Sequence, residues 1–486
     1  MILRKAKASD FDALCELYQT VSAHMESEGE FQWVWGRYPS AELVRHDLDA
    51  GLIWCLYGKD GMAVAVTVDA SPQEDYAGRD WLFGVRPGVF HRMAVRPDLR
   101  REGLGRKALA DVETLLIQLG CDSLRCDCYE DNTPAIRFYV TAGMRQAGRA
   151  MLNTRPKPFL LFEKRLTEDC PLLPQRMRPA FRGGKLTPWG GDKLLRIYDK
   201  PIRDIPTGES LEISAIPDLE SRSVTGVNLT ELIRRYGQAL VGKYDFQAFP
   251  LLLKLIDAKE PLSVQVHPDD AYARANEHGK LGKTEAWLIL DAPKDAELVY
   301  GIKPGTSLSE LKEACEQGAA VEPLLRRVKV KAGDVCYIPS GCVHAISAGI
   351  MLYEIQQSSD ITYRFYDWDR VDKKGKRREL HLRQALDVTD LNLVPEPVPA
   401  PDQPIARVLD KPHFTLDLLR PEAEKPVALP QVKDFAFLTV LEGDSLTLSW
   451  EADALTLAKG ESLLIPASAP ALKLNGKGFA AVAMPK

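Results

Sequence analysis

The stretch PLSVQVHPDD (residues 261–270) is a short β-like run that ends in a histidine followed at once by a proline. Side chains alternate between the two faces of a strand, so Gln265 and His267 would share one face. Pro268 cannot donate a hydrogen bond to a β ladder, and it fixes the backbone just past the imidazole. An amide and an imidazole held together in this way indicate part of a binding site, whose other groups must come from elsewhere in the chain.

The sequence changes character along its length, which predicts several domains. Residues 10–25 repeat apolar residues at helical spacing, whereas residues 61–71 and 123–130 have the pattern of strands. From about residue 192 onward, short β runs are separated by Gly and Pro, as in a sandwich or barrel. The predicted organisation is an α/β domain (1–166), a linker (167–180), a β domain (181–391), a Pro-rich linker (392–404) and a smaller β domain (405–486).

Composition excludes several classes of function. At 486 residues the chain exceeds what one core supports, and a net charge of −5 gives no electrostatic case for nucleic acid or an anionic membrane. No apolar run approaches the roughly 18–20 residues of a membrane helix, and the N-terminus lacks the apolar core of a secretory signal. The nine cysteines are scattered and odd in number, so a reducing cytoplasm is expected.

Two segments downstream of residues 261–270 offer further metal ligands. GKTEAWLIL (282–290) contains Glu285, and GDVCYIPSGCVHAI (333–346) contains His344. Together with Gln265 and His267 they make a nitrogen and oxygen set without a thiolate. Catalytic zinc sites favour His and carboxylate ligands, whereas structural sites are commonly rich in Cys. The alternative is a barrel with unconnected polar residues on its strands.

The N-terminal domain contains a basic glycine loop before a predicted helix. RPDLRREGLGRKALA (96–110) has the pattern R-x-x-G-x-G at Arg100, Gly103 and Gly105, and Arg101 and Arg106 add positive charge. Glycines allow backbone amides to approach an anion, and the N-terminus of the helix directs its positive end toward it. The spacing fits neither a Rossmann nor a Walker loop. An ordinary basic helix N-terminus is the alternative.

A second segment extends this pattern to a known family. YEDNTPAIRFYVTAGMRQAG (129–148), about thirty residues after the glycine loop, resembles the corresponding segment of the GNAT-family N-acetyltransferases. The resemblance implies that Asn132 contacts acetyl-CoA and that Tyr139 protonates the departing thiolate. It also implies cofactor-binding roles for Val95, Arg100, Arg101, Gly103, Gly105 and Arg106. For Tyr139 the alternative is an ordinary core aromatic, and the general base and the acceptor amine stay open.

The second half resembles the cupins and, more specifically, the type I phosphomannose isomerases. The resemblance rests on LSVQVHPDD, GKTEAW and IPSGCVHAI, with further matches in TPWGGDKL (187–194), GESLEIS (208–214) and SSDITYRFYDWDR (358–370). It implies a mainly β double cupin of jelly-roll barrels with a few helices, following the N-terminal α/β fold. It also implies one zinc ion held by Gln265, His267, Glu285 and His344, and the interconversion of mannose 6-phosphate and fructose 6-phosphate through a cis-enediol.

Four charged residues near these motifs are candidates for the isomerase chemistry. Arg364 matches the family's active-site arginine and would stabilise the enediolate or bind the phosphate. Lys283 shares a strand face with Glu285 if the strand is regular, and would serve the phosphate or the proton shuttle. Glu354 and Asp360 match acidic positions of the family and would orient the arginine or carry protons. Solvated surface charge is the alternative for Lys283 and Arg364.

These patterns together predict a bifunctional cytoplasmic enzyme, an isomerase fused to an acetyltransferase. Its partners would be small molecules: the two sugar phosphates, acetyl-CoA and an amine, with neither nucleic acid nor a membrane. The alternative is a non-catalytic cupin that senses sugar phosphates and carries a regulatory acetyl-CoA-binding domain.

Overall fold

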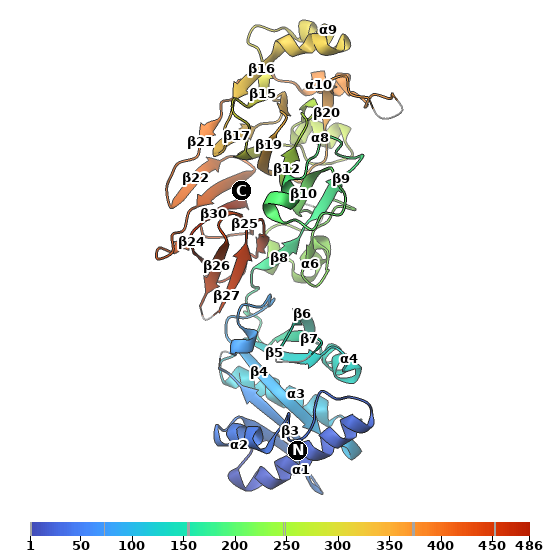
Figure 1. Cartoon of the computed structure of the whole chain (residues 1–486), viewed down its shortest axis with the longest axis vertical. Coiled ribbons are helices and arrows are strands. Elements are labelled where there is room, and N and C mark those ends of the chain that lie inside the picture. The colour runs from blue at the N-terminus through green and yellow to red at the C-terminus, as the bar shows by residue number, and fades with distance from the viewer. Residues whose placement is uncertain are drawn as a thin grey trace. The chain divides into compact units, whose positions relative to one another are not determined.

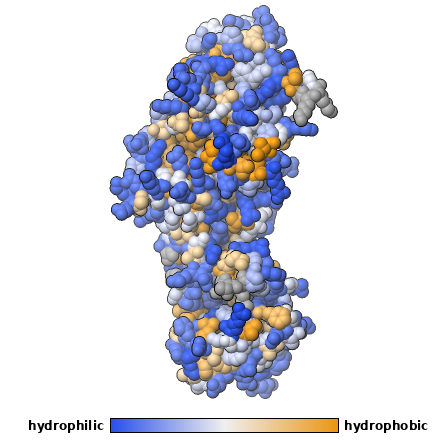
Figure 2. All heavy atoms as spheres, in the orientation of Figure 1, coloured by the Kyte–Doolittle hydropathy of each residue, from blue (hydrophilic) through white to orange (hydrophobic). Residues whose placement is uncertain are grey.

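The computed structural model describes residues 2–71, 73–152, 156–245, 247, 249–371, 375–451 and 453–486. The chain forms two compact units, one of Met1–Leu173 with Ser449–Leu455 and one of Pro174–Leu448 with Thr456–Lys486 (Figure 1). The first boundary falls inside the predicted linker 167–180. None of the helices in the described residues is both long and apolar enough to span a bilayer. The face drawn in Figure 2 is mostly hydrophilic, with scattered hydrophobic groups.

The first unit is a mixed sheet with helices on both faces. Its strand order is β1-β2-β3-β4-β5-β7-β6, in which only the β4–β5 pair is parallel among the described residues. The strands are β1 (Arg4–Lys5), β2 (Ile53–Gly58), β3 (Gly61–Asp69), β4 (Pro87–Val95), β5 (Ser123–Tyr129), β6 (Arg145–Ala150) and β7 (Phe159–Arg165). The helices are α1 (Phe11–Ser27), α2 (Ala41–Asp49), α3 (Leu104–Gln118) and α4 (Thr133–Thr141).

Successive side chains of β3 point to opposite faces of this sheet, which shows that α1 and α2 cover one face and that α3 and α4 cover the other. Ala65 of β3 is buried in the core formed with α1 and α2. Its neighbours Val64 and Val66 are buried in the core that contains α3 and part of α4. At Gly88 of β4 an added Cβ would lie 2.3 Å from Leu116 Cδ2 of α3, so glycine permits the close approach of that helix.

The parallel strands β4 and β5 pair over only part of their length. The paired residues end at Val89 and Arg125, although both strands continue beyond them. The register of β4 against β3 shifts between the partners of Ala65 and Thr67, and Arg92 there has φ 48°. Such a bulge bends a strand and increases its twist. The parts of β4 and β5 that do not pair with each other both line a cavity.

The second unit is built mainly from sheets. One described sheet has the order β21-β17-β14-β19-β12-β10-β9 and another the order β16-β15-β18-β13-β20. Residues of both sheets share one hydrophobic core, including Ile256, Trp287 and Leu352 from the first and Leu298 and Ile346 from the second. The two sheets therefore pack face to face.

The strands of these two sheets supply the residues of interest. Those of the first sheet are β9 (Ala180–Gly183), β10 (Thr207–Ile213), β12 (Leu251–Ala258), β14 (Glu285–Asp291), β17 (Asp334–Ile338), β19 (Ile350–Gln357) and β21 (Val398–Pro399). Those of the second are β13 (Val264–Val266), β15 (Glu297–Ile302), β16 (Leu325–Lys329), β18 (His344–Ile346) and β20 (Tyr363–Tyr366). Strand β21 lies inside the predicted Pro-rich linker and pairs with β17.

The remaining strands form two more sheets, of order β11-β8-β28-β25-β30-β23-β22 and β24-β29-β26-β27. The strands of the first are β8 (Gln175–Arg178), β11 (Arg222–Ser223), β22 (Ile405–Asp410), β23 (Phe414–Leu419), β25 (Ala436–Glu442), β28 (Ser462–Ile465) and β30 (Phe479–Pro485). Those of the second are β24 (Val427–Ala428), β26 (Ser445–Trp450), β27 (Asp453–Ala458) and β29 (Lys473–Asn475). Strand β8 lies within the predicted linker 167–180 and pairs with β28.

Short helices connect these strands. They are α5 (Lys193–Tyr198), α6 (Leu229–Tyr236), α7 (Gln238–Val241), α8 (Asp270–Asn276), α9 (Leu308–Glu316) and α10 (Leu382–Val388). Helix α8 follows Pro268 directly, and the Asp269 side chain accepts a hydrogen bond from the Tyr272 amide, which caps it. The turn after His267 is therefore fixed by a proline and a capped helix.

Candidate metal centre and candidate cofactor cleft

Strand pairing in the five-stranded sheet brings three of the predicted residues into one row. Strand β13 lies between β18 and β20, and Gln265 pairs with His344 on one side and with Arg364 on the other. The Gln265 Nε2 atom lies 3.3 Å from His344 Nε2, and its Oε1 atom accepts a hydrogen bond of 3.3 Å from Ser263.

A carboxylate from the facing sheet completes a compact cluster. The ligating atoms of His267, Glu285 and His344 all lie within 4.8 Å of one another, and all three residues are buried. The His267 Nε2 atom is 3.1 Å from Glu285 Oε1, and His344 Nε2 is 3.8 Å from Glu285 Oε2. The structure thus brings together His267, Glu285 and His344, three of the four predicted ligands. The side-chain amide of the fourth, Gln265, lies next to His344.

The protonation states of the two imidazoles leave lone pairs inside this cluster. Burial, together with the nearby Lys283 ammonium, lowers the pKa of His267 to about 3, so its ring is neutral. Burial also lowers the pKa of His344. The His344 Nδ1–H donates to the Cys342 carbonyl at 2.9 Å, which leaves the Nε2 lone pair facing Glu285.

The Glu285 carboxylate shows that this donor set fits a cation. Its side chain is 1% exposed, its Oε1 atom contacts the Lys283 ammonium, and its Oε2 atom lies 3.8 Å from His344 Nε2. Burial raises the pKa of Glu285, but Lys283 and His267 together lower it by more than burial raises it, so this pKa lies well below the usual range. A buried anion requires positive charge beside it, which the Lys283 ammonium supplies at Oε1. Two neutral imidazoles and one carboxylate are the donors that catalytic zinc sites use.

Lys283 is the cation already in contact with this cluster. Its ammonium forms an ion pair with Glu285 and lies 3.1 Å from His267 Nε2. The predicted shared side of Lys283 and Glu285 is therefore seen in the structure, although Lys283 comes just before β14. Burial of Lys283 makes the surface-charge alternative wrong for this residue.

A row of buried charges lies beside the cluster on β14, β19 and β12. Trp287 pairs with Glu354, and Glu354 pairs with Lys254. The Trp287 Nε1–H donates to Glu354 at 2.9 Å, while Lys254 Nζ lies 3.2 Å from the other Glu354 oxygen and 3.4 Å from Glu209. Burial and the charge of Glu285 raise the pKa of Glu354.

Lys254 and Glu209 are absent from the residues that the sequence predicted. Their signal was a charged residue in a short β run: Lys254 in LLLKLIDA (251–258), which also contains Asp257, and Glu209 in GESLEIS, which also contains Glu212. A charged side chain is almost never fully buried without a partner of opposite charge, so a lysine in one such strand indicates a carboxylate in a neighbouring strand.

Arg364 and Asp360 differ in their surroundings. The Arg364 Nε–H is buried and has no hydrogen-bond partner among the described residues, and burial and Arg378 lower the pKa of its guanidinium. The Asp360 side chain is 45% exposed and pairs with Lys280 at 2.9 Å. The structure therefore places Arg364 beside Gln265 in the sheet but gives Asp360 a surface ion pair.

The first unit contains a cavity of about 1600 Å³ at the unpaired ends of β4 and β5. Every residue predicted to act on the acetyl-CoA cofactor lines it: Val95, Arg100, Arg101, Gly103, Gly105, Arg106, Asn132 and Tyr139. Helix α3 begins at Leu104, directly after Gly103 with φ 81°. The exposed Arg100, Arg101 and Arg106 form no ion pair within the described part of the chain, so this end of the cavity is free to bind an anion.

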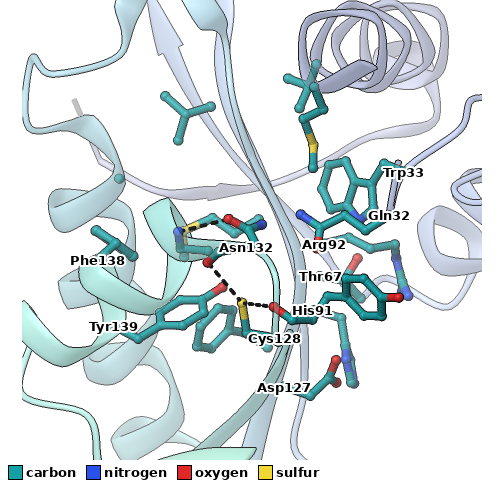
Figure 3. A pocket seen from close by; sticks show the side chains of 18 of the residues that line it. Gln32, Trp33, Thr67, His91, Arg92, Asp127, Cys128, Asn132, Phe138 and Tyr139 are labelled. Carbon is teal, nitrogen blue, oxygen red and sulfur yellow. Dashed lines mark hydrogen bonds between the residues drawn. The ribbon is translucent and has the colours of Figure 1, made fainter. Parts of the chain in front are cut away.

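Asn132 and Tyr139 lie on helix α4 and its cap. The Asn132 side chain accepts a hydrogen bond of 3.0 Å from the Ala135 amide and so caps the helix. The Tyr139 ring packs against Phe90, Phe138 and Phe162 with centroids 5.5–5.7 Å apart. Burial raises the pKa of Tyr139 well above its ordinary value, so the phenol keeps its proton. Figure 3 shows Tyr139 directed into the cavity, toward Cys128.

Comparisons with known proteins match the two units separately. Residues 20–144 match the acetyltransferase (GNAT) family, and residues 188–302 match the catalytic domain of type I phosphomannose isomerase. The mannose-6-phosphate isomerase ManA of Bacillus subtilis is 39% identical over 297 residues, 59% of this chain and 92% of that protein. The mannose-6-phosphate isomerase of Streptococcus mutans is 37% identical with the same coverage. A crystal structure of the Bacillus subtilis mannose 6-phosphate isomerase superposes with a TM-score of 0.57 at 34% identity, covering 64% of this chain and 99% of that one.

Proposed function

Because this chain belongs to the mannose-6-phosphate isomerase family and carries a GNAT acetyltransferase domain, we propose that it is a bifunctional enzyme. Its second unit would interconvert mannose 6-phosphate and fructose 6-phosphate, and its first unit would transfer an acetyl group from acetyl-CoA to an amine. The observation that carries the isomerase assignment is the buried cluster of His267, Glu285 and His344.

The proposal includes the fold and location predicted from the sequence. The second unit would be a double cupin divided into residues 181–391 and 405–486, and the face-to-face packing of two sheets supports a barrel in the first of these parts. All nine cysteines have free thiols in the structure, which suits a cytoplasmic enzyme.

The isomerase site would hold one zinc ion on Gln265, His267, Glu285 and His344. The ion would supply positive charge beside the sugar oxygens at which negative charge develops. The amide of Gln265 can present its oxygen or its nitrogen to the site, since the two are related by rotation of the terminal group. Because this amide is neutral, the site stays more positive than it would with a second carboxylate.

The chain's own charged residues would handle the substrate. A proton must move between C1 and C2 of the sugar, and an enediolate forms on the adjacent oxygens. The buried Lys283 ammonium and the Arg364 guanidinium would stabilise that charge or bind the phosphate. Glu354, held by Trp287 and Lys254, is a proposed proton carrier, and Asp360 would act only through its neighbours.

In the first unit, the basic end of the cavity would bind the pyrophosphate of acetyl-CoA. The N-terminus of α3 and the three arginines of the loop supply positive charge there. Val95 and Asn132 would contact the rest of the cofactor. Tyr139, whose phenol stays protonated, would give its proton to the thiolate as the thioester breaks.

Removal of the metal tests the isomerase proposal. Prolonged dialysis of the full-length protein against a chelator is expected to lower isomerisation of mannose 6-phosphate by at least about a hundredfold. Zinc added back should restore it. A coupled assay that follows fructose 6-phosphate measures both steps. Sugar-phosphate binding without turnover in the zinc-loaded protein would favour the non-catalytic sensor instead.

Arg364→Lys tests the arginine without removing its positive charge. Lysine lacks the planar fork that binds two oxygens at once, so kcat/KM for mannose 6-phosphate should fall by about a hundredfold. A fall in kcat would indicate stabilisation of the enediolate, and a rise in KM would indicate a phosphate contact. Arg235→Lys on the exposed side of α6 is the matched control. An unchanged kcat/KM in Arg364→Lys would remove this residue from the site.

A further inference from the structure

The cavity of the first unit has two ends of opposite charge. Its basic end is the arginine loop before α3. Away from this loop, near the residues where Asp69 pairs with Val89, the lining includes the carboxylates of Asp69, Glu74, Asp75 and Asp127. It also includes Glu28, Glu30, Asp47, Arg37 and Arg92. None of the first four carboxylates forms an ion pair with the described residues, whereas Asp47, which also lines the cavity, is paired with Arg92. A site for a cofactor anion at one end thus faces an unneutralised negative region at the other.

Asp127 and Tyr139 lie on opposite faces of the sheet at the place where β4 and β5 separate. Cys126 and Cys128 are buried in the core on the α3 and α4 face, against which Tyr139 also packs. Asp127 lies between them on β5, so its side chain points to the α1 and α2 face. In Figure 3, Tyr139 and Asp127 lie on either side of Cys128. Residues of both faces line the same cavity, Met25 and Asp47 from one and Phe138 and Tyr139 from the other, so a thioester bound there would be accessible from both.

The Asp127 carboxylate is held in a fixed position. The Tyr76 hydroxyl donates to its Oδ1 atom at 2.5 Å. Tyr76 is 3% exposed, and its backbone carbonyl accepts a hydrogen bond of 2.9 Å from the Trp81 indole. Burial and the nearby Asp75 raise the pKa of Asp127, which makes it a stronger proton acceptor than an ordinary aspartate.

His91 is the other titratable group at this position. Its ring lies 5.9 Å from that of Tyr76, and its backbone pairs with Thr67 on β3. Burial and the neighbouring Arg92 lower the pKa of His91 to about 4. A neutral imidazole cannot neutralise an approaching ammonium, whereas a carboxylate can. Asp127 is therefore the stronger candidate.

We propose that Asp127 binds the acetyl acceptor and takes its proton, and that the acceptor is a primary alkyl amine that is cationic at neutral pH. This inference rests on the proposed acetyl transfer. Glu74 and Asp75, exposed at the same end of the cavity, would attract the cation before it reaches Asp127.

The proton balance of the transfer is complete with these residues. The ammonium gives one proton to Asp127, and the freed nitrogen lone pair forms a bond to the thioester carbon. When the carbon–sulfur bond breaks, the thiolate takes the proton of Tyr139. The second nitrogen proton restores Tyr139 through solvent, and the proton on Asp127 is released with the products.

The test uses Asp127→Asn in the full-length protein with acetyl-CoA and two probe amines, n-butylamine and 1,4-diaminobutane. Thiol release should fall about 10²–10⁴-fold relative to wild type, because asparagine cannot accept a proton. Acetyl-CoA affinity, measured by calorimetry, should be unchanged. Asp49→Asn, on the exposed end of α2 outside the cavity, is the matched control.

Each other outcome has a defined meaning. Transfer within a few-fold of wild type in Asp127→Asn overturns the inference, as does a wild type that acetylates neither probe amine. In the latter case, intact acetyl-CoA binding leaves the proposed acetyl transfer standing, whereas lost binding removes that proposal too. If Asp127→Asn itself fails to bind acetyl-CoA, Tyr76→Phe decides, since it removes only the hydrogen bond to Asp127. A roughly tenfold loss of transfer would then support the inference, and unchanged transfer would overturn it.

Discussion

His267→Ala is expected to lower isomerisation of mannose 6-phosphate by at least about a thousandfold and to abolish zinc binding. The substitution removes one of two neutral imidazoles and leaves the buried Glu285 with Lys283 and His344 as its neighbours. One imidazole and one carboxylate then remain with the neutral Gln265 amide, which is fewer strong ligands than the three of a catalytic zinc site. Zinc content by mass spectrometry and the coupled isomerase assay measure the two effects on one preparation.

Two comparisons separate this result from a general loss of structure. His413→Ala, between β22 and β23 and outside the cluster, should keep both zinc and activity. Acetyl transfer by the His267→Ala protein should also persist, because the cavity lies in the other compact unit. Full isomerase activity in His267→Ala would show that the metal and the chemistry lie elsewhere.

Tyr139→Phe is expected to lower acetyl transfer by about a thousandfold while isomerisation stays at the wild-type rate. The ring contacts with Phe90, Phe138 and Phe162 persist in phenylalanine, so the helix should pack as before. Only the hydroxyl is lost, and with it the proton for the thiolate, a contribution typical of general acids. Release of the free thiol from acetyl-CoA, with n-butylamine as the acceptor, measures the change.

The matched control for Tyr139→Phe is Tyr57→Phe, which removes a hydroxyl on β2 away from the cavity. It should leave acetyl transfer intact. Transfer at the wild-type rate in Tyr139→Phe would reduce this residue to a core aromatic. A parallel fall in isomerisation would instead indicate that the two units are coupled.

Local patterns in the sequence predicted those parts of the structure that depend on near neighbours. The apolar repeat of residues 10–25 corresponds to α1, and the runs at 61–71 and 123–130 correspond to β3 and β5. The shared side of Gln265 and His267 also agrees with the structure, since both side chains lie near His344. Both domain families were identified correctly from their motifs. The helix, the strands and the shared side of Gln265 and His267 follow from periodicity and turn chemistry, which act over a few residues, whereas the families were recognised by resemblance.

Features set by pairing between distant segments could not be predicted in the same way. The contact between Lys254 and Glu354 depends on the register of β12 against β19, which no local pattern specifies. The opening between β4 and β5 depends on where their ladder ends and on the bulge near Arg92. The role proposed for Asp127 depends on that opening, so no local pattern could single this residue out as a general base.

The row of Trp287, Glu354 and Lys254 also bears on how the chain avoids misfolding. Strands β12 and β19 pair without interruption from Leu251 to Ala258, and all of these residues are buried, so hydrophobicity alone would tolerate a slipped alignment. A slip of one position would turn the Lys254 side chain to the opposite face of the sheet. Its buried ammonium would then lack its carboxylate partners, which would lower the free energy of unfolding by about 3–5 kcal/mol. The ionic contacts that border the candidate metal site thus favour one register of its scaffold strands. We expect uncharged replacements there to allow slipped pairing while changing the stability little.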